Sequence, residues 1–184
     1  MSRKNWWDSV YEQNSPPKMY SDDKTAERGA EYLDIPSVKT IEDWGCGWGG
    51  FKNYIGSHQR YVGIDGSQTP AADKIVDLET YKSEVDAIYM RHVLEHNPGW
   101  KNILENAVQS FTKHLVIVIF TPFQEDETRI IQEYDNWNGT GQTMVDIGFK
   151  YEDITQCLGD LVFITENLKT PTQYGVETIF YISK

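Results

Sequence analysis

Glycines at positions 45, 47, 49 and 50 form the part of the sequence best suited to hold a ligand. Gly45, Gly47 and Gly50 have the spacing G-x-G-x-x-G, and Asp65 follows about 20 residues after the first of them. Glycine lets the backbone approach a ligand that a Cβ would exclude, and an acid at that distance can bind both hydroxyls of a ribose. The spacing therefore predicts a nucleotide site, as in nicotinamide dehydrogenases. A tight turn without a ligand is the alternative.

Four segments, in order, resemble the motifs of the class I S-adenosylmethionine-dependent methyltransferases. They are DWGCGWG (43–49), YVGIDGS (61–67), KIVDLET (74–80) and VDAIYMRHVLEH (85–96). The last of them contains the VLEH tetrapeptide found in many small-molecule members of that family. The resemblance covers about residues 38 to 120 by motif, and from there to the C-terminus by topology only. It implies S-adenosylmethionine as the cofactor, S-adenosylhomocysteine as its product, and an α/β fold with a Rossmann-like open sheet.

The resemblance also assigns roles in cofactor binding. Asp43 would orient the turn or meet the ammonium group, and backbone N–H groups would receive the carboxylate of the methionine part. Asp65 would hold the ribose, and Asp77 and Leu78 the adenine. The alternatives are local: Asp43 and Asp77 cap turns, and Asp65 opens the turn DGS. The expected cofactor-binding residues are Asp43, Gly45, Cys46, Gly47, Gly49, Asp65, Gly66, Asp77, Leu78 and Arg91.

Two histidines end the fourth motif, where the fold implied by the resemblance places the transferred methyl group. Histidine titrates near neutral pH and can take a proton from an acceptor, so His92 and His96 are the candidate catalytic residues. We favour His92, which lies nearer the end of the expected strand. In the alternative interpretation His92 only contacts cofactor or backbone, and His96 caps the turn before NPGW.

Two aromatic segments are candidates for closing the site. Trp7, Tyr11 and Tyr20 precede the motifs and either cover the cofactor or dock on the sheet. Residues 121–141 follow the fifth expected strand; there Tyr134, Trp137 and Asn138 suit a polar, sugar-like acceptor. The alternative for EDETRIIQEY (125–134) is a solvated helix with Ile130 and Ile131 facing inward. We expect no metal site, because the consecutive acids at 125–127 cannot all face one ion.

The elements that would position these residues alternate between strand and helix. We expect a single domain over residues 1–184, with an N-terminal helical lid (1–37) and an α/β core (38–184). Its sheet is mostly parallel and ends in an antiparallel C-terminal hairpin. Strands are expected near Thr40–Trp44, Arg60–Ile64, Lys74–Val76, Ala87–Arg91, Leu115–Phe120, Leu161–Leu168 and Val176–Ser183. Helices are expected near Asp22–Leu33, Gly49–Ile55 and Trp100–Phe111.

The composition of the chain disfavours some classes of binding partner. The net charge of −11 disfavours nucleic acid and anionic membranes, and the longest apolar run, Leu115–Phe120, is too short to span a bilayer. Cys46 and Cys157 indicate neither a disulfide framework nor a zinc cluster. We expect a soluble cytoplasmic protein. One departure from the family pattern is Glu42 in the first strand, which needs a partner such as Lys39 or Lys52 if it is buried.

The sequence thus predicts a methyltransferase that acts on a small polar acceptor at oxygen. An N-methyltransferase acting on a protein or amine is the alternative within the same family, because an acidic surface attracts cationic acceptors. A nicotinamide oxidoreductase and a non-catalytic cofactor-binding module are the alternatives from other classes. The sequence does not determine the oligomeric state.

Overall fold

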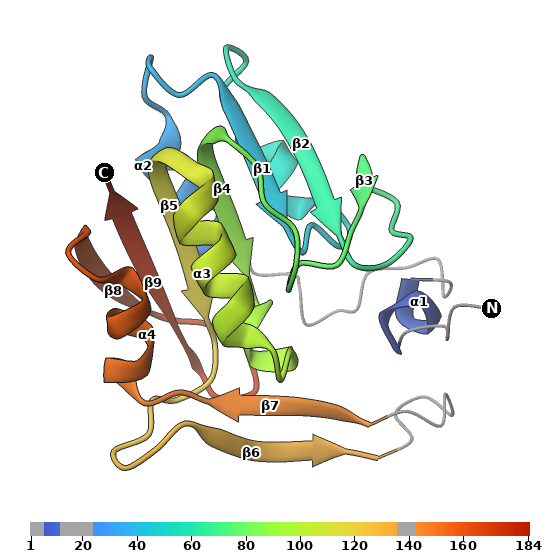
Figure 1. Ribbon diagram of the computed structural model, residues 1–184. Coiled ribbons are helices and arrows are strands. Elements are labelled where there is room, and N and C mark those ends of the chain that lie inside the picture. The colour runs from blue at the N-terminus through green and yellow to red at the C-terminus, as the bar shows by residue number, and fades with distance from the viewer. Residues whose placement is uncertain (1–5, 12–23, 136–142) are drawn as a thin grey trace.

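Seven strands form one mixed sheet in the order β3-β2-β1-β4-β5-β9-β8 (Figure 1). The computed structural model describes residues 6–11, 24–135 and 143–184. The strands of this sheet are β1 (Thr40–Trp44), β2 (Arg60–Asp65), β3 (Lys74–Ile75), β4 (Val85–Arg91), β5 (Phe111–Ile119), β8 (Val162–Lys169) and β9 (Val176–Ser183). The positions of these strands agree with the sequence pattern, with β5 beginning four residues earlier than expected.

The sheet is parallel in its first five strands and antiparallel at its C-terminal edge. β1 pairs in parallel with β2 and β4, while β9 lies antiparallel between β5 and β8. Short apolar runs such as Leu115–Ile119 are buried on both faces, as strands in the middle of a covered sheet must be. The expected α/β architecture with an antiparallel C-terminal hairpin is therefore confirmed.

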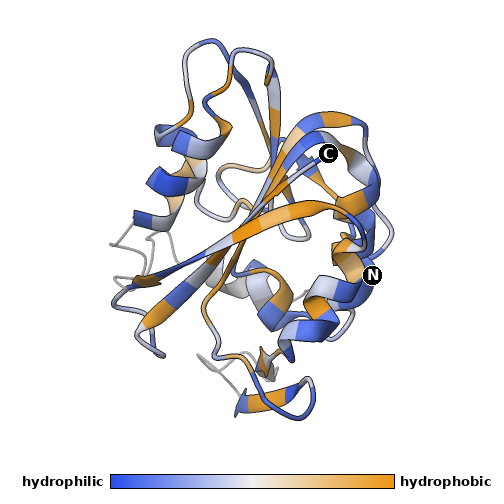
Figure 2. Cartoon of the chain, turned by 90° about the vertical axis from the view of Figure 1, so that its left-hand side faces the viewer, coloured by the Kyte–Doolittle hydropathy of each residue, from blue (hydrophilic) through white to orange (hydrophobic). Residues whose placement is uncertain are grey.

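Helices cover both faces of the sheet. α3 (Trp100–Ser110) and α4 (Tyr151–Leu158) lie on one face, where Ile103, Leu104 and Ile154 enter the larger apolar cluster. α2 (Lys24–Leu33) covers the other face with Ala26, Ala30 and Leu33. Figure 2 shows apolar segments along the strands and polar residues on the outer sides of the helices. α2 is thus part of the core packing. None of the helices in the described ranges has the length and apolar character needed to span a bilayer.

One expected helix, and one that was the alternative interpretation of its segment, are replaced by other structures. The segment after the glycine turn forms only a 3₁₀ helix, η2 (Gly50–Asn53), because Gly50, Asn53 and Gly56 are poor helix formers. Residues 125–134 do not form a solvated helix; they contain β6 (Arg129–Tyr134), in which Ile130 is 47% exposed. β6 pairs antiparallel with β7 (Met144–Gly148), which together with α4 was not anticipated. The backbone hydrogen bonds of this pairing and the β-branched pair Ile130–Ile131 favour a strand.

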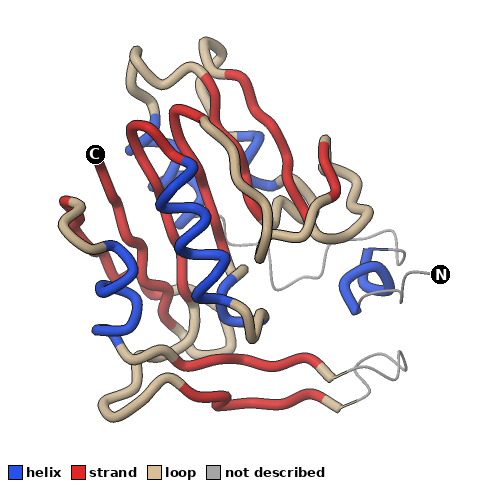
Figure 3. The backbone as a smooth tube through the Cα atoms, in the orientation of Figure 1, coloured by secondary structure: helices blue, strands red, loops and turns tan. Residues whose placement is uncertain are grey.

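The β6–β7 hairpin is a separate two-stranded sheet that lies across the carboxyl ends of β4 and β5 (Figure 3). The Thr121 hydroxyl, just after β5, donates to the Ile147 carbonyl at 2.7 Å, and Gln124 N donates to the Phe149 carbonyl at 2.8 Å. β7 also packs against the 3₁₀ helix η3 (Leu94–His96). The hairpin therefore adds a wall at the edge of the sheet where parallel α/β folds bind ligands.

Glu42 is buried in β1, and its partners differ from those that the sequence suggested. Its carboxylate accepts hydrogen bonds from Trp44 Nε1, the Ser83 hydroxyl and the Tyr81 hydroxyl, at 2.9, 2.7 and 3.0 Å. Lys74 Nζ lies 3.5 Å away and is the ion-pair partner, in place of Lys39 or Lys52. This set of donors satisfies the buried carboxylate, so Glu42 is accounted for by packing within the fold.

Candidate functional site

A cavity of about 670 Å³ opens at the carboxyl ends of β1, β2 and β4. It brings together eleven of the twelve residues that sequence analysis expected to bind the cofactor or act in catalysis. These are Asp43, Gly45, Cys46, Gly47, Asp65, Gly66, Asp77, Leu78, Arg91, His92 and His96. Gly49 is the exception, since its neighbour across the turn is Ala71. The volume lies within the range of small-molecule and cofactor sites.

The glycine turn between β1 and η2 needs glycine on conformational grounds. Gly45 and Gly47 have φ angles of +76° and +49°, where an L side chain is strained. A Cβ on Gly45 would lie 2.3 Å from Val93 Cγ2, and one on Gly47 would lie 3.0 Å from the Tyr11 hydroxyl. Both positions line the cavity, and glycine is needed there because the left-handed backbone and the contacts with Val93 and Tyr11 leave no room for a Cβ.

Two buried carboxylates lie behind the glycine turn. Asp65, at the end of β2, accepts hydrogen bonds from Gly47 N at 3.0 Å and Ser67 N at 2.9 Å, and burial raises its pKa. Asp43, at the end of β1, accepts a hydrogen bond from the Tyr61 hydroxyl at 2.7 Å. Burial raises the pKa of Asp43 to about 7, and the nearby Asp65 adds to the shift. Asp65 thus ties the two strand ends together, and a cationic ligand would favour the ionised form of Asp43.

The third motif provides one wall of the cavity. Asp77 caps the following turn, as the alternative interpretation suggested, by accepting from Glu79 N at 2.9 Å. It also lines the cavity beside the buried Leu78. On the opposite wall, Cys46 is buried against the Thr69 hydroxyl, and burial raises the pKa of its thiol to about 12. Cys46 is therefore a neutral packing group at physiological pH.

The first histidine lies directly after β4 in a strained conformation and contacts a buried acid. His92 has a φ of +56°, and its Nε2 contacts Glu177 of β9. Glu177 also accepts hydrogen bonds from Arg91 Nε at 3.2 Å and the Thr25 hydroxyl at 3.1 Å. Burial, together with the Arg91 charge, lowers the pKa of His92 to about 4 despite the carboxylate. His92 is neutral under ordinary conditions.

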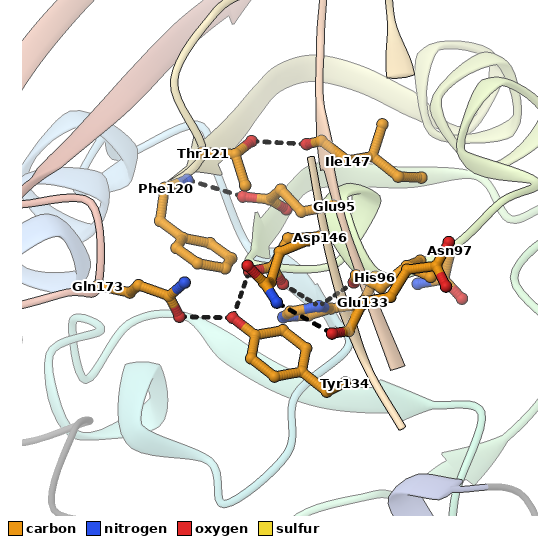
Figure 4. A network of polar contacts seen from close by, with 12 residues as sticks. Glu95, His96, Asn97, Phe120, Thr121, Glu133, Tyr134, Asp146, Ile147 and Gln173 are labelled. Atoms are coloured by element: carbon orange, nitrogen blue, oxygen red, sulfur yellow. Dashed lines mark hydrogen bonds and ion pairs between the residues drawn. The ribbon is translucent and has the colours of Figure 1, made fainter. Parts of the chain in front are cut away.

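The second histidine belongs to a network that the β6–β7 hairpin completes (Figure 4). His96 Nδ1 lies 3.0 Å from the Val145 carbonyl and 3.3 Å from Asp146 Oδ1. Asp146 Oδ2 accepts hydrogen bonds from the hydroxyls of Tyr134 and Tyr174, both at 2.9 Å. Burial alone would lower the pKa of His96, but Asp146 and Glu95 raise it overall. The two histidines therefore have pKa values shifted in opposite directions.

Aromatic side chains cover the open side of the cavity. α1 (Trp6–Tyr11) places Trp7 against the His96 ring, with centroids 5.4 Å apart, and Tyr11 against Trp48, 5.7 Å apart. Trp48 Nε1 is buried and has no hydrogen-bond partner among the described residues. Trp48 itself lines the cavity, and the described residues leave this buried N–H unsatisfied. Tyr20, Trp137 and Asn138, also expected near the site, lie outside the described residues.

No protein-family model matches the chain, and no curated protein matches it in sequence. Solved structures match it in fold. A 1,6-didemethyltoxoflavin-N1-methyltransferase from Burkholderia thailandensis, bound to 1,6-didemethyltoxoflavin and S-adenosylhomocysteine, has a TM-score of 0.71, with 14% identity over 96% of this chain and 84% of that one. For the magnesium protoporphyrin IX methyltransferase of Synechocystis, bound to S-adenosylhomocysteine, the TM-score is 0.66, with 15% identity over 97% and 92%.

The N-methyltransferase NodS from Bradyrhizobium japonicum, in complex with S-adenosylhomocysteine, matches with a TM-score of 0.64 and 15% identity over 98% of this chain and 99% of that one. The fold is that of the class I methyltransferases. The fold that the four sequence motifs implied is therefore confirmed, and the cavity described above lies in a methyltransferase fold.

Sequence reasoning missed two buried acids in this region, Glu177 and Asp146. Each lies on a strand from the C-terminal third of the chain and contacts a histidine that lies 50 or more residues earlier. A signal was present for Glu177, because a charged residue in the apolar segment VETIFYIS requires a buried partner. No comparable signal existed for Asp146, because β7 itself was not expected.

Proposed function

We propose that this protein is an S-adenosylmethionine-dependent methyltransferase that acts on a small polar acceptor at oxygen. The observation that carries the proposal is the cavity itself. It unites the glycine turn, Asp43 and Asp65 at the carboxyl edge of a methyltransferase-like sheet. The neighbours named above hold S-adenosylhomocysteine, which supports the same cofactor here.

The residues present fit this cofactor. Gly45 and Gly47 line the cavity in left-handed conformations that favour glycine, so this turn can pass close to the methionine part. We assign the ammonium or sulfonium side to Asp43, the ribose to Asp65 and Gly66, and the adenine to Asp77 and Leu78. Arg91 is assigned a supporting role, since its guanidinium is engaged by Glu177. When bound, S-adenosylmethionine supplies a methyl group on a positively charged sulfur.

The acceptor is assigned to the end of the cavity that holds the histidines. His92 and His96 lie there, with α1 across the opening and the β6–β7 hairpin packed against η3 behind His96. These groups would position the acceptor, exclude water and take its proton, and position is the main contribution to a methyl transfer. We assign the role of lid to α1, because Trp7 and Tyr11 line the cavity.

A nitrogen acceptor is the second candidate. Two of the neighbours are named N-methyltransferases, and the net charge of −11 favours the approach of a cationic amine. A panel of small alcohols, phenols and amines, each incubated with labelled S-adenosylmethionine, separates the two. Label in a product ether supports the first candidate, whereas label in a product amine supports the second.

Calorimetric titration tests cofactor binding directly. S-adenosylmethionine and S-adenosylhomocysteine should bind saturably to the wild type, while NADH should not. Asp65→Ala should lose that binding, and Asp160→Ala, an exposed acid beyond α4, should retain it. Binding of NADH alone would point to a nicotinamide oxidoreductase. Adenosyl binding without turnover on any acceptor of the panel would leave the non-catalytic binding module as the better description.

A further inference from the structure

We propose that His96, positioned by Asp146 of the β6–β7 hairpin, is the base that takes the proton from the methyl acceptor. This inference rests on the proposed function and deepens it. Sequence analysis favoured His92 for this role. The structure assigns the role to His96 because its environment has the arrangement that a histidine base needs.

One nitrogen of the His96 ring, Nδ1, faces two hydrogen-bond acceptors. Nδ1 of His96 lies within hydrogen-bond distance of the Val145 carbonyl and close to Asp146 Oδ1, at 3.0 and 3.3 Å. Both atoms only accept hydrogen bonds, so the proton of the neutral imidazole must sit on Nδ1. The lone pair is then on Nε2, for which no hydrogen bond exists within the described residues. A carboxylate behind Nδ1 fixes the tautomer and stabilises the cation formed on proton uptake.

The carboxylate of Asp146 is held in place by its own hydrogen bonds. Asp146 is 1% exposed, and the hydroxyls of Tyr134 and Tyr174 both donate to Oδ2. Tyr134 also lies 2.5 Å from Gln173 Oε1, which joins the hairpin to the segment before β9. These contacts come from β6, β7 and the 170–175 segment, none of which contributes to the expected cofactor-binding residues. The insertion after β5 and the segment before β9 therefore hold His96 independently of the expected cofactor-binding residues.

The charged groups around His92 and His96 act on protonation in opposite directions. The contact between His92 Nε2 and Glu177 is shared with Arg91, whose positive charge opposes protonation of the imidazole. His96 lies 3.3 Å from Asp146 Oδ1 instead, and both Asp146 and the neighbouring Glu95 raise its pKa. A base works best when its pKa lies near the working pH, which the surroundings of His96 favour and those of His92 oppose. His92 is then a neutral wall of the cavity.

In the proposed step the acceptor atom, oxygen or nitrogen, forms a bond to the methyl carbon. The carbon–sulfur bond breaks, and its electron pair stays on sulfur. The acceptor proton moves to His96 Nε2, which leaves an imidazolium next to the Asp146 carboxylate. Charge and atoms balance, because the sulfonium charge of the reactant becomes the imidazolium charge of the product state. The acceptor class is therefore one that carries a removable proton, such as a hydroxyl or a neutral N–H.

The test measures the tautomer and pKa of His96 by ¹H–¹⁵N NMR of histidine-labelled protein, with S-adenosylhomocysteine titrated in parallel. The charged and titratable groups that face His96 are Glu95 from η3, Asp146 from β7 and His92 after β4, with the phenols of Tyr134 and Tyr174. The signals of His96 are identified by their loss in His96→Gln. In the wild type at a pH where His96 is neutral, they should show the proton on Nδ1. Asp146→Asn should lower the pKa of His96 by about one unit or more, and Glu133→Gln, an exposed acid on the same hairpin, should not change it.

Each outcome decides one question. An Nε2–H tautomer in the wild type overturns the proposal without any variant, so a poorly folded Asp146→Asn protein does not protect it. An unchanged pKa in folded Asp146→Asn overturns it as well. Failure of S-adenosylhomocysteine to bind the wild type would instead overturn the proposed function, whatever the tautomer. Once the panel has identified an acceptor, Asp146→Asn should lower kcat at least tenfold, while its KM for S-adenosylmethionine stays within twofold. Equal effects on kcat and KM would overturn the positioning role of Asp146.

Discussion

Glu177 is a fully buried acid that contacts both Arg91 and His92, so it should contribute to the stability of the fold. Burial raises its pKa, but the contact with His92 and the Arg91 charge lower it overall, below the ordinary 4.5. A carboxylate with a depressed pKa stabilises the fold above its unfolded pKa and loses that contribution as the pH falls through the folded value. Glu177→Gln should therefore lower the free energy of unfolding by about 3 kcal/mol at pH 7. Urea unfolding at pH 7 and pH 4 measures this difference, which should shrink at the lower pH.

The matched control is Glu152→Gln, an exposed acid in the first turn of α4. It should change the free energy of unfolding by less than about 0.5 kcal/mol at either pH. A loss in Glu177→Gln that stays constant between pH 7 and pH 4 would mean that packing, and not ionisation, is what the carboxylate contributes.

Asp43 should couple cofactor binding to pH. Burial raises its pKa to about 7, and a cationic ligand nearby would lower it again. Binding of S-adenosylmethionine should therefore release a proton from Asp43, and affinity should rise between pH 5.5 and pH 7.5. Calorimetry in buffers of different ionisation enthalpy counts the released protons. Asp43→Asn should release fewer protons than the wild type, and an equal count in both proteins would remove Asp43 from the ammonium site.

Among individual residues, the sequence predicted the site residues that lie within the motifs and missed their partners elsewhere in the chain. Asp43, Asp65 and the histidines are adjacent to strand ends that a pattern can locate. Their partners Glu177 and Asp146 come from β9 and β7, and the pairing depends on where the sheet places those strands. A contact between residues that lie far apart in the chain leaves no periodic signal in either segment, so the tautomers of the histidines were beyond sequence reasoning.

The turn between β1 and η2 separates two uses of glycine. Gly49 has a φ of +75°, and a Cβ there would lie 2.6 Å from Ala71 Cβ, away from the cavity. Gly49→Ala should lower the free energy of unfolding by about 2 kcal/mol, from the left-handed backbone and the clash together. Adding Ala71→Gly should recover the part due to the clash, leaving about 1 kcal/mol. Thermal and urea unfolding measure both variants.

Gly47→Ala is the comparison, because Gly47 lines the cavity. It should weaken binding of S-adenosylhomocysteine at least tenfold, while folded Gly49→Ala should bind as the wild type does. If the two variants lost affinity equally, the turn would act as one unit and the distinction drawn from the cavity lining would be wrong.

Elements were predictable where one local signal dominated. The core strands, α2 and α3 each have an apolar pattern of the correct period, and their positions agreed with the pattern. The alternative interpretation of the β6 segment was a helix, because Ile130 and Ile131 fit a helical face, whereas its strand state depends on pairing with β7. The expected helix after the glycine turn shortened to η2 because the turn residues cannot propagate a helix. Tertiary pairing decided the first case and local propensity the second.

For the whole molecule, the position of the cavity predicts where a ligand will stabilise the chain. A ligand that binds only the folded state at 100 times its dissociation constant adds about 2.7 kcal/mol. For a domain of this size that is about 5–10 °C in Tm. S-adenosylhomocysteine should produce such a rise in the wild type and none in Asp65→Ala. Hydrogen exchange should slow at the carboxyl edge, in the turns after β1 and β2 and in α1, because the cavity lies between them.

The edge of the sheet at β8 provides the internal reference for the hydrogen-exchange experiment. β8 is the outer strand, with Val162 and Ile164 exposed, and it lies beyond β9 and β5 from the cofactor turn. Its exchange reflects local opening, which a ligand at the other edge does not reach. Protection confined to the carboxyl edge would place the ligand in the cavity, and the same rise in Tm with uniform protection would mean that the ligand acts only by stabilising the global fold. Protection centred on β8 would place the ligand outside the cavity and contradict the assignment of the site.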